Sequence, residues 1–268
     1  MAAPVLRYER DGAVALAVFD RAERLNPLSV DFQQALREVC AQVREDRSVR
    51  ALLLTGEGRA FCVGADLSSL GQPVPGDERS LGSRVAEQMH ALSNRLILDL
   101  HELPVPVVSA VNGVCAGAGV GVALAADVVL AAKSAYFYLP FLPRLGIVPD
   151  LGSSWFMQRL AGRGRALGLS LLGDRLGAEQ AVQWGLAWAC VDDAALRSEA
   201  MAIAQRLARL PAHAALEARL AYDAAASHSL AEQLHYEAER QRELLDQPSF
   251  TEGVSAFLQK REPRFDGR

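Results

Sequence analysis

The chain has 268 residues, 50% of them hydrophobic and 22% charged, so it can bury a large core as one or two domains. Its formal net charge is -4 and it has no Lys/Arg cluster, so nucleic acid and acidic membrane surfaces are not expected partners. Its apolar runs are too short for a membrane span, and residues 1–12 lack the apolar segment of a signal peptide. We therefore expect an unprocessed globular protein without membrane segments.

Cysteine and histidine spacing argues against metal or disulfide chemistry. Cys40, Cys62, Cys115 and Cys190 are scattered without the spacing of a disulfide framework or a zinc site. We interpret them as reduced, small apolar side chains, which favours a cytoplasmic protein. The five histidines also lack a partner at ligand spacing, so neither a metal nor a cofactor is expected.

The first part of the chain predicts two buried strands with a helix between them. Residues 13–20 and 50–56 are short apolar runs bounded by Gly, Asp or Arg, which is typical of buried strands. Ser29 is the predicted N-cap of the helix, because apolar residues recur after it at helical spacing.

The same alternation continues further along the chain. A predicted helix over 81–103, ended by Pro104, precedes a strand over 105–111, and another strand covers 127–132. Alternating strands and helices predict an α/β core with a largely parallel sheet.

Helices alone are expected after about residue 195. We predict a core over 1–194 and a helical domain over 195–268, rich in Ala, Leu, Glu and Arg. Leu196, Ile203, Leu207 and Leu210 form an apolar stripe that a small helical unit does not need for its own core, so it predicts self-association.

A glycine-rich stretch, NGVCAGAGVGVALAAD, occupies residues 112–127. A dinucleotide-binding GxGxxG loop is disfavoured, because Val122 stands where the last glycine is required. Small residues can simply allow close helix packing. However, Gly117 and Ala118 fall at a predicted strand-to-helix junction, where free N–H groups can hold an oxyanion.

A family resemblance rests on four segments in order: GRAFCVGADL, PVVSAVNGVCAGAG, LGIVPDLGSSW and EGVSAFLQKREPRF. Together they resemble the signature segments of the enoyl-CoA hydratase/isomerase (crotonase) superfamily. The resemblance implies a spiral core of ββα repeats, a C-terminal helical trimerisation domain, and cofactor-independent catalysis on an acyl-CoA thioester. It also implies a homotrimer or a dimer of trimers.

The resemblance assigns the oxyanion hole to two backbone N–H groups, those of Ala65 and Ala118. Such donors stabilise the enolate that forms when a proton leaves C2 of the thioester. Small residues at 117–119 would let the backbone itself approach the thioester.

The two glutamates of the family's hydratases have no counterpart here. Their positions fall on Gly121 and on Phe141 or Leu142, and none of these side chains can take a proton. One carboxylate, Asp150, matches the single acid/base of some isomerases in the family. The competing interpretation of Asp150 is a turn or helix-cap aspartate, because PDLGSS has good capping residues.

Apolar neighbours should raise the pKa of Asp150 by desolvation. The neighbours expected from the sequence are Leu139, Phe141, Leu142 and Trp155. Asp127, at the end of an apolar helix, is interpreted instead as a structural, hydrogen-bonded carboxylate.

The positions expected to contact substrate are Arg24, Leu25, Val63, Gly64, Asp66, Leu67, Gly117, Phe141, Leu142, Phe257 and Lys260. By resemblance, Phe257 and Lys260 would contact the CoA adenine and phosphates, with Arg24 and Leu25 near the nucleotide. The alternatives are a plain amphipathic terminal helix for Phe257 and Lys260, and a helix cap for Asp66.

Three functions stay open at this point. The leading one is an acyl-CoA isomerase that migrates a double bond or isomerises a ring epoxide through Asp150. The others are an enoyl-CoA hydratase with an atypical water site and a CoA-ester-binding protein without turnover.

Overall fold

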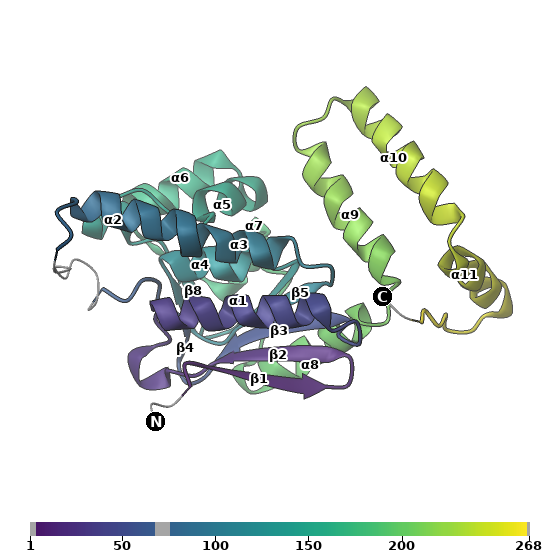
Figure 1. Ribbon diagram of the computed structural model, residues 1–268, viewed down its shortest axis with the longest axis horizontal. Helices are drawn as coiled ribbons and strands as arrows, with labels where there is room; N and C mark the ends of the chain where they lie inside the picture. The colour runs from purple at the N-terminus through teal and green to yellow at the C-terminus, as the bar shows by residue number, and fades with distance from the viewer. Residues whose placement is uncertain (1–3, 68–75, 267–268) are drawn as a thin grey trace.

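Two β-sheets and the helices packed on them form the body of the chain, and helices near the C-terminus extend away from it (Figure 1). The computed structural model describes residues 4–67 and 76–266. The strands are β1 (Leu6–Asp11), β2 (Val14–Phe19), β3 (Ala51–Gly56), β4 (Ala60–Cys62), β5 (Val107–Val111), β6 (Val114–Ala116), β7 (Val128–Ala132), β8 (Tyr136–Tyr138), β9 (Arg175–Gly177) and β10 (Ala189–Val191).

Helices of three kinds connect these strands. The α-helices are α1 (Val30–Glu45), α2 (Leu81–Gln88), α3 (Asn94–His101), α4 (Ala118–Leu124), α5 (Ser153–Ala161), α6 (Arg163–Leu172), α7 (Ala178–Trp184), α8 (Leu196–Leu207), α9 (Ala212–Ala225), α10 (Leu230–Leu245) and α11 (Pro248–Gln259). The 3-10 helices are η1 (Ala22–Arg24) and η4 (Asp193–Ala195), and the π-helical segments are η2 (Met89–Ser93) and η3 (Phe141–Leu145).

The larger sheet has the strand order β1-β2-β3-β5-β7-β10. Its strands are parallel except for β1, which pairs antiparallel with β2. Helix α1 packs on β1 and β2, and α8 packs on β2, β3, β5 and β7 from the opposite side (Figure 1). Cover on both faces explains why β2 and β3 are continuous apolar runs rather than alternating ones. The predicted strands at 13–20, 50–56, 105–111 and 127–132 are confirmed.

The smaller sheet has the order β4-β6-β8-β9. Strands β4, β6 and β8 are parallel and directly follow β3, β5 and β7 of the larger sheet. The chain therefore alternates between the two sheets, which confirms the expected spiral of ββα repeats. Sequence analysis did not predict these strands, because three residues are too few to show a period.

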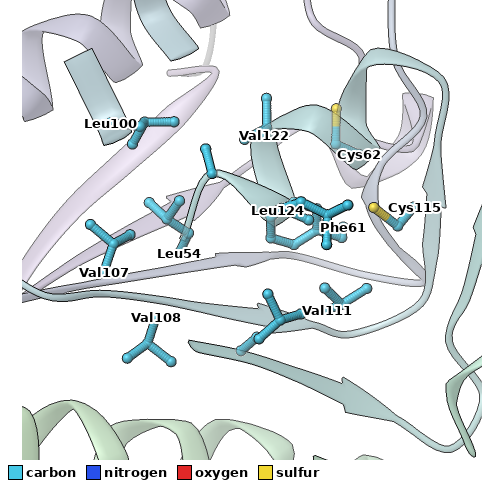
Figure 2. Packing of buried hydrophobic residues seen from close by; sticks show 14 of the residues in the cluster. Leu54, Phe61, Cys62, Leu100, Val107, Val108, Val111, Cys115, Val122 and Leu124 are labelled. Carbon is cyan, nitrogen blue, oxygen red and sulfur yellow. The ribbon is translucent and has the colours of Figure 1, made fainter. Parts of the chain in front are cut away.

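One apolar core joins the two sheets. Figure 2 shows labelled members of this core from β3, β4, β5, β6, α3 and α4. The ring of Phe19 makes edge-to-face contacts with Phe32 at 4.7 Å and with Phe61 at 4.9 Å between centroids. These contacts link β2, α1 and β4, so the two sheets and the first helix form one packed unit.

The helix signals in the first part of the chain are confirmed. Ser29 caps α1 by accepting a hydrogen bond from the Phe32 N–H at 3.3 Å. The predicted helix over 81–103 occurs as α2, the π-helical η2 and α3 in succession. No helix in the described part of the chain is long and apolar enough to cross a membrane.

Helix α8 is part of the packing of the core. Leu196 is 3% exposed, and Ile203 and Leu207 pack against the core cluster. The apolar stripe that predicted self-association is therefore largely used to cover the sheet, because α8 lies directly on its strands. The division of the chain at residue 194 stays a prediction.

Helix α9 is attached to the core through a partly buried arginine. Arg219 forms a two-pronged ion pair with Asp127 at 2.7 and 2.6 Å and donates to the carbonyl oxygens of His101, Leu103 and Val105. Asp127 also accepts a hydrogen bond from the Val107 N–H at 2.7 Å. The structural role predicted for Asp127 is thus observed, since its carboxylate links α9 to β5.

Candidate active site

The start of helix α4 exposes backbone rather than side chains. Gly117 is its N-cap, with φ 54° and ψ -132°, a conformation that residues with a Cβ rarely adopt. The Gly117 N–H donates to the Tyr138 carbonyl at 2.9 Å, which holds the turn against β8. The next N–H, that of Ala118, is at the first helical position and has no intrahelical partner.

A second turn lies directly against the first. A Cβ on Gly64 would lie 2.9 Å from the Ala116 oxygen and 3.1 Å from the Ala118 nitrogen, so the two backbones meet here. Ala65 forms an isolated β-bridge with Leu28, whose N–H donates to the Gly64 oxygen at 2.8 Å. The helix expected to begin at Leu67 falls largely on residues 68–75, which lie outside the described residues.

Ala65 and Ala118 both line one cavity. Within the described ranges, neither of their N–H groups donates a backbone hydrogen bond. The first turn of a helix also carries partial positive charge. Two adjacent turns in the cavity wall therefore each carry an N–H without a backbone partner among the described residues, an arrangement suited to a carbonyl oxygen that gains negative charge.

Two asparagines, the buried Asn26 and the half-buried Asn112, hold the loops behind these turns. The Asn26 side chain accepts from the Arg21 N–H at 2.9 Å and donates to the Ala60 oxygen at 2.8 Å. The Asn112 side chain accepts from the Gly56 N–H at 3.1 Å and donates to the Gly58 oxygen at 2.9 Å. Since their partners flank β4, these amides fix the approach to the turn at Gly64.

The cavity between the two turns and the helices has a volume of about 490 Å³. Its wall combines apolar side chains, the two turns and a few polar groups. The lining residues are Leu28, Ser29, Val30, Gln33, Val63, Ala65, Asp66, Leu67, Val85, Gln88, Met89, Ser93, Gly117, Ala118, Pro140, Phe141, Leu145, Ile147, Asp150 and Leu151.

The lining that the structure describes contains two carboxylates, Asp66 and Asp150, and Asp66 has an ion pair with Arg24. The Asp150 Oδ1 is buried and has no hydrogen-bond partner among the described residues, and burial raises the pKa of Asp150 from its ordinary 3.8 to about 6. The capping interpretation is not supported: Gly152 is the N-cap of α5, and no side chain caps that helix. A carboxyl group with this pKa can both accept and return a proton near neutral pH.

Gly121 has no space for a side chain. A Cβ at this position would collide with the carbonyl oxygen of Leu151, the residue next to Asp150. A hydratase glutamate therefore cannot occupy position 121 in this backbone arrangement. The other position falls on Phe141, which is 4% exposed and lines the cavity, or on Leu142, which is 42% exposed and does not.

Most of the predicted site residues are brought together. Val63, Asp66, Leu67, Gly117 and Phe141 line the same cavity as Ala65, Ala118 and Asp150. Arg24 lies outside the lining but reaches it through an ion pair with Asp66 at 3.0 Å. Leu25 follows it in a left-handed conformation, with φ 63°.

Other predicted positions lie elsewhere in the chain. Leu142 is 42% exposed and is outside the cavity lining, and Trp155 lines a separate hollow beside α9. Phe257 is 83% exposed on α11, at the end of the molecule away from α2 (Figure 1), and Lys260 is the C-cap of that helix. The single chain does not bring α11 to the cavity, because α9 and α10 carry it away from the core. Burial raises the pKa of Asp150 as expected, but of the four predicted apolar neighbours only Phe141 lines the cavity with it. Leu139, Leu142 and Trp155 do not line it.

The sequence did not predict the part of the cavity wall that α1, α2 and η2 supply. Val85, Gln88, Met89 and Ser93 reach the cavity from one side, with Gln33 from α1. Their signal in the sequence is an ordinary amphipathic helix, which does not distinguish a cavity wall from a core face. Among residues 4–67 and 76–266, no three His, Cys, Asp or Glu side chains are grouped as metal ligands would be.

The fold and site define an α/β spiral protein whose cavity combines backbone donors with one weakly compensated carboxyl group. The family model for enoyl-CoA hydratase/isomerase matches residues 9–268. The chain belongs to this family, and it is therefore an enzyme of the hydratase/isomerase type that acts on CoA thioesters.

Some individual relatives are named isomerases and others hydratases. The chain is 42% identical over 264 residues to 1,2-epoxyphenylacetyl-CoA isomerase of Escherichia coli, covering 98% of both chains. It is 40% identical over 263 residues to a protein of Rhodobacter capsulatus named "Probable enoyl-CoA hydratase", again over 98% of both. The crystal structure of enoyl-CoA hydratase from Bacillus anthracis superimposes with a TM-score of 0.90 at 28% identity, covering 98% of this chain and 100% of that one.

The Asp150→Asn variant should gain stability relative to wild type as the pH rises. Because the folded pKa of about 6 exceeds the unfolded 3.8, ionisation costs stability in the folded state. The cost is absent below about pH 4, grows through about pH 6, and reaches roughly 2–3 kcal/mol above it. Denaturant unfolding of both proteins at acidic and mildly alkaline pH measures the difference. A stability difference independent of pH would show that Asp150 does not titrate in this way.

Proposed function

We propose that the enzyme is an acyl-CoA isomerase in which Asp150 moves a proton along the acyl chain. The observation that carries the proposal is the combination of one buried, weakly compensated carboxyl group with a position 121 that has no room for a second one. Proton transfer along an acyl chain requires one acid/base, whereas hydration also requires groups that order and activate water.

The proposed chemistry begins at the thioester oxygen. The N–H groups of Ala65 and Ala118 would hold it, and they would bind more strongly as negative charge develops. An oxyanion-hole donor is worth about 3 kcal/mol of transition-state stabilisation. Two such donors would lower the free-energy barrier to removal of the C2 proton enough for an ordinary carboxylate to act as the base.

Asp150 would act twice in one turnover. As the carboxylate it takes the C2 proton of a 3-enoyl-CoA and leaves an enolate, and as the neutral acid it returns the proton at C4. The raised pKa supports this double role, because a group that titrates near neutral pH is neither a very weak base nor a very weak acid. No redox or metal cofactor is needed for these steps.

Ring-epoxide isomerisation is the second reaction of this type that the site could support. The relative that favours it is the Escherichia coli enzyme named 1,2-epoxyphenylacetyl-CoA isomerase, at 42% identity. The apolar wall, with Phe141, Leu145 and Ile147, is compatible with either a chain or a ring. Hydration is the alternative activity, supported by the name of the Rhodobacter capsulatus relative.

Asp150→Asn is expected to lower the rate of double-bond migration in 3-enoyl-CoA by about two to four orders of magnitude, because the amide cannot accept or return the proton. Wild-type turnover should rise with pH through about 6 as Asp150 ionises. The absorbance of the conjugated 2-enoyl thioester measures both reactions, because it appears on migration in 3-enoyl-CoA and disappears on hydration of 2-enoyl-CoA.

The matched control for this experiment is Asp174→Asn, which changes an exposed aspartate outside the cavity and should leave turnover unchanged. The hydratase alternative would be favoured if double-bond migration survived in Asp150→Asn. It would also be favoured if wild type hydrated 2-enoyl-CoA rapidly and the substitution did not change that rate. Binding of these thioesters without any turnover would favour a binding protein.

Ala118→Pro is expected to reduce turnover by roughly two to three orders of magnitude, because proline deletes one oxyanion donor. Proline is tolerated at the first position of a helix, which is where Ala118 stands, so the fold should persist. Ala118→Ser keeps the N–H and serves as the control. Circular dichroism confirms folding, and equal turnover by the folded proline variant would place the oxyanion hole elsewhere.

We also propose a homotrimer or a dimer of trimers. The support is the set of large apolar side chains left exposed on α9, α10 and α11: Leu220, Tyr222, Leu230, Leu234, Phe250, Val254, Phe257 and Leu258. In such an assembly, Phe257 and Lys260 would contact the CoA nucleotide portion from α11. Sedimentation at micromolar concentration is expected to give the mass of three or six chains, and a stable monomer would contradict the proposal.

A cytoplasmic location is part of the same proposal. Its support is that all four cysteines are free, three of them buried, as expected of a protein kept in a reducing compartment.

A further inference from the structure

A polar pair interrupts the largely apolar wall on one side of the cavity. Gln33 from α1 and Ser93 from the end of η2 both line it, and each residue is only 5% exposed. Their neighbours in the wall include Val85, Met89 and Ile147. Polar groups in an apolar binding cavity are few and usually select or orient the ligand.

The hydrogen bonds of the pair determine the direction of both groups. The Gln33 Nε2 donates to the Leu28 carbonyl at 3.2 Å, which can only accept. The amide oxygen of Gln33 is therefore turned toward Ser93, and the Ser93 hydroxyl donates to it at 2.6 Å. Reversing the amide would place two oxygens against each other at Leu28, so this arrangement is the one that the surroundings favour.

This arrangement leaves each of the two residues with hydrogen-bonding capacity that no described residue uses, an acceptor on one and a donor on the other. Once its hydrogen is used, the Ser93 oxygen can only accept, and in the described part of the chain no group donates to it. The Gln33 Nε2 has a second hydrogen, for which the described residues supply no acceptor. The pair can thus provide one acceptor and one donor.

The position of Ser93 sets it apart from an ordinary helical serine. A serine inside a helix commonly bonds back to the carbonyl one turn earlier, as Ser170 does to Ala166 at 2.9 Å. Ser93 instead bonds sideways to another helix and ends a π-helical segment, a rare irregularity that occurs often at functional sites.

We propose that Gln33 and Ser93 form a specificity subsite for an acyl group that carries a hydroxyl. A hydroxyl both donates and accepts, so it could satisfy the Ser93 oxygen and the free Gln33 N–H together. An epoxide or ether oxygen could use the Gln33 N–H alone, and an alkyl chain would use neither. The proposal rests on the proposed acyl-CoA function insofar as it assigns this cavity to the acyl group.

The test compares the binding of octanoyl-CoA with that of hydroxyoctanoyl-CoA isomers in which the hydroxyl is moved along the chain. By titration calorimetry, wild type should bind the best hydroxyl isomer about five- to tenfold more tightly than octanoyl-CoA. These thioesters are saturated, so the preference is measured whether or not Asp150 catalyses isomerisation.

Variants separate a specificity role from a structural one. The double variant Gln33→Met/Ser93→Ala removes both sides of the Gln33–Ser93 hydrogen bond, together with the Gln33 donor to the Leu28 carbonyl. It should abolish the preference for the hydroxyl isomer while octanoyl-CoA affinity stays within about twofold. Ser170→Ala removes a helical hydroxyl outside the cavity and should keep the preference. A wild-type protein without preference at any hydroxyl position, or a double variant that retains the preference, would overturn the proposal. The wild-type comparison decides the matter even if the double variant fails to fold.

Discussion

Backbone-to-backbone contact around the start of α4 is the constraint on which the rest of the site depends. Gly64 meets the Ala116 to Ala118 turn, and Gly121 meets the Leu151 carbonyl, with no room for a Cβ at Gly121. Interiors are packed densely, so side chains at these positions would push the turns apart. Because they are absent, two loops separated in the sequence can present their N–H groups to one cavity.

The same contact limits the chemistry available to the enzyme. The Leu151 carbonyl occupies the space that a side chain at Gly121 would need, and Leu151 itself adopts a left-handed conformation, with φ 46°. Such strain in a residue with a Cβ persists only where packing enforces it. The strained residue directly follows Asp150, so the segment that excludes one carboxylate from the cavity also brings another to its wall.

Polar groups are satisfied differently where α9 joins the core and in the cavity. Arg219 and Asp127 are satisfied by one another and by backbone groups, as expected of a pair with a structural role. Asp150 has a carboxylate oxygen without a hydrogen-bond partner in the part of the chain that the structure describes, and burial raises its pKa. A carboxylate without a hydrogen-bond partner in a ligand-sized cavity indicates a functional role, because a burial cost that no partner offsets would only destabilise the fold.

The sequence by itself determined the local features: the Ser29 cap, the four longer strands, the glycine-rich turn and, through its motifs, the family. It also predicted as site residues Ala65, Ala118 and Asp150, which line one cavity. These are encoded within short windows by hydrophobic period, capping chemistry and motif spacing. The tertiary structure alone decided that α8 covers the sheet, that Gly121 abuts Leu151, and that α11 lies away from the cavity. It also decided that Gln33 meets Ser93 across 60 positions, since such contacts depend on how helices cross and not on any local pattern.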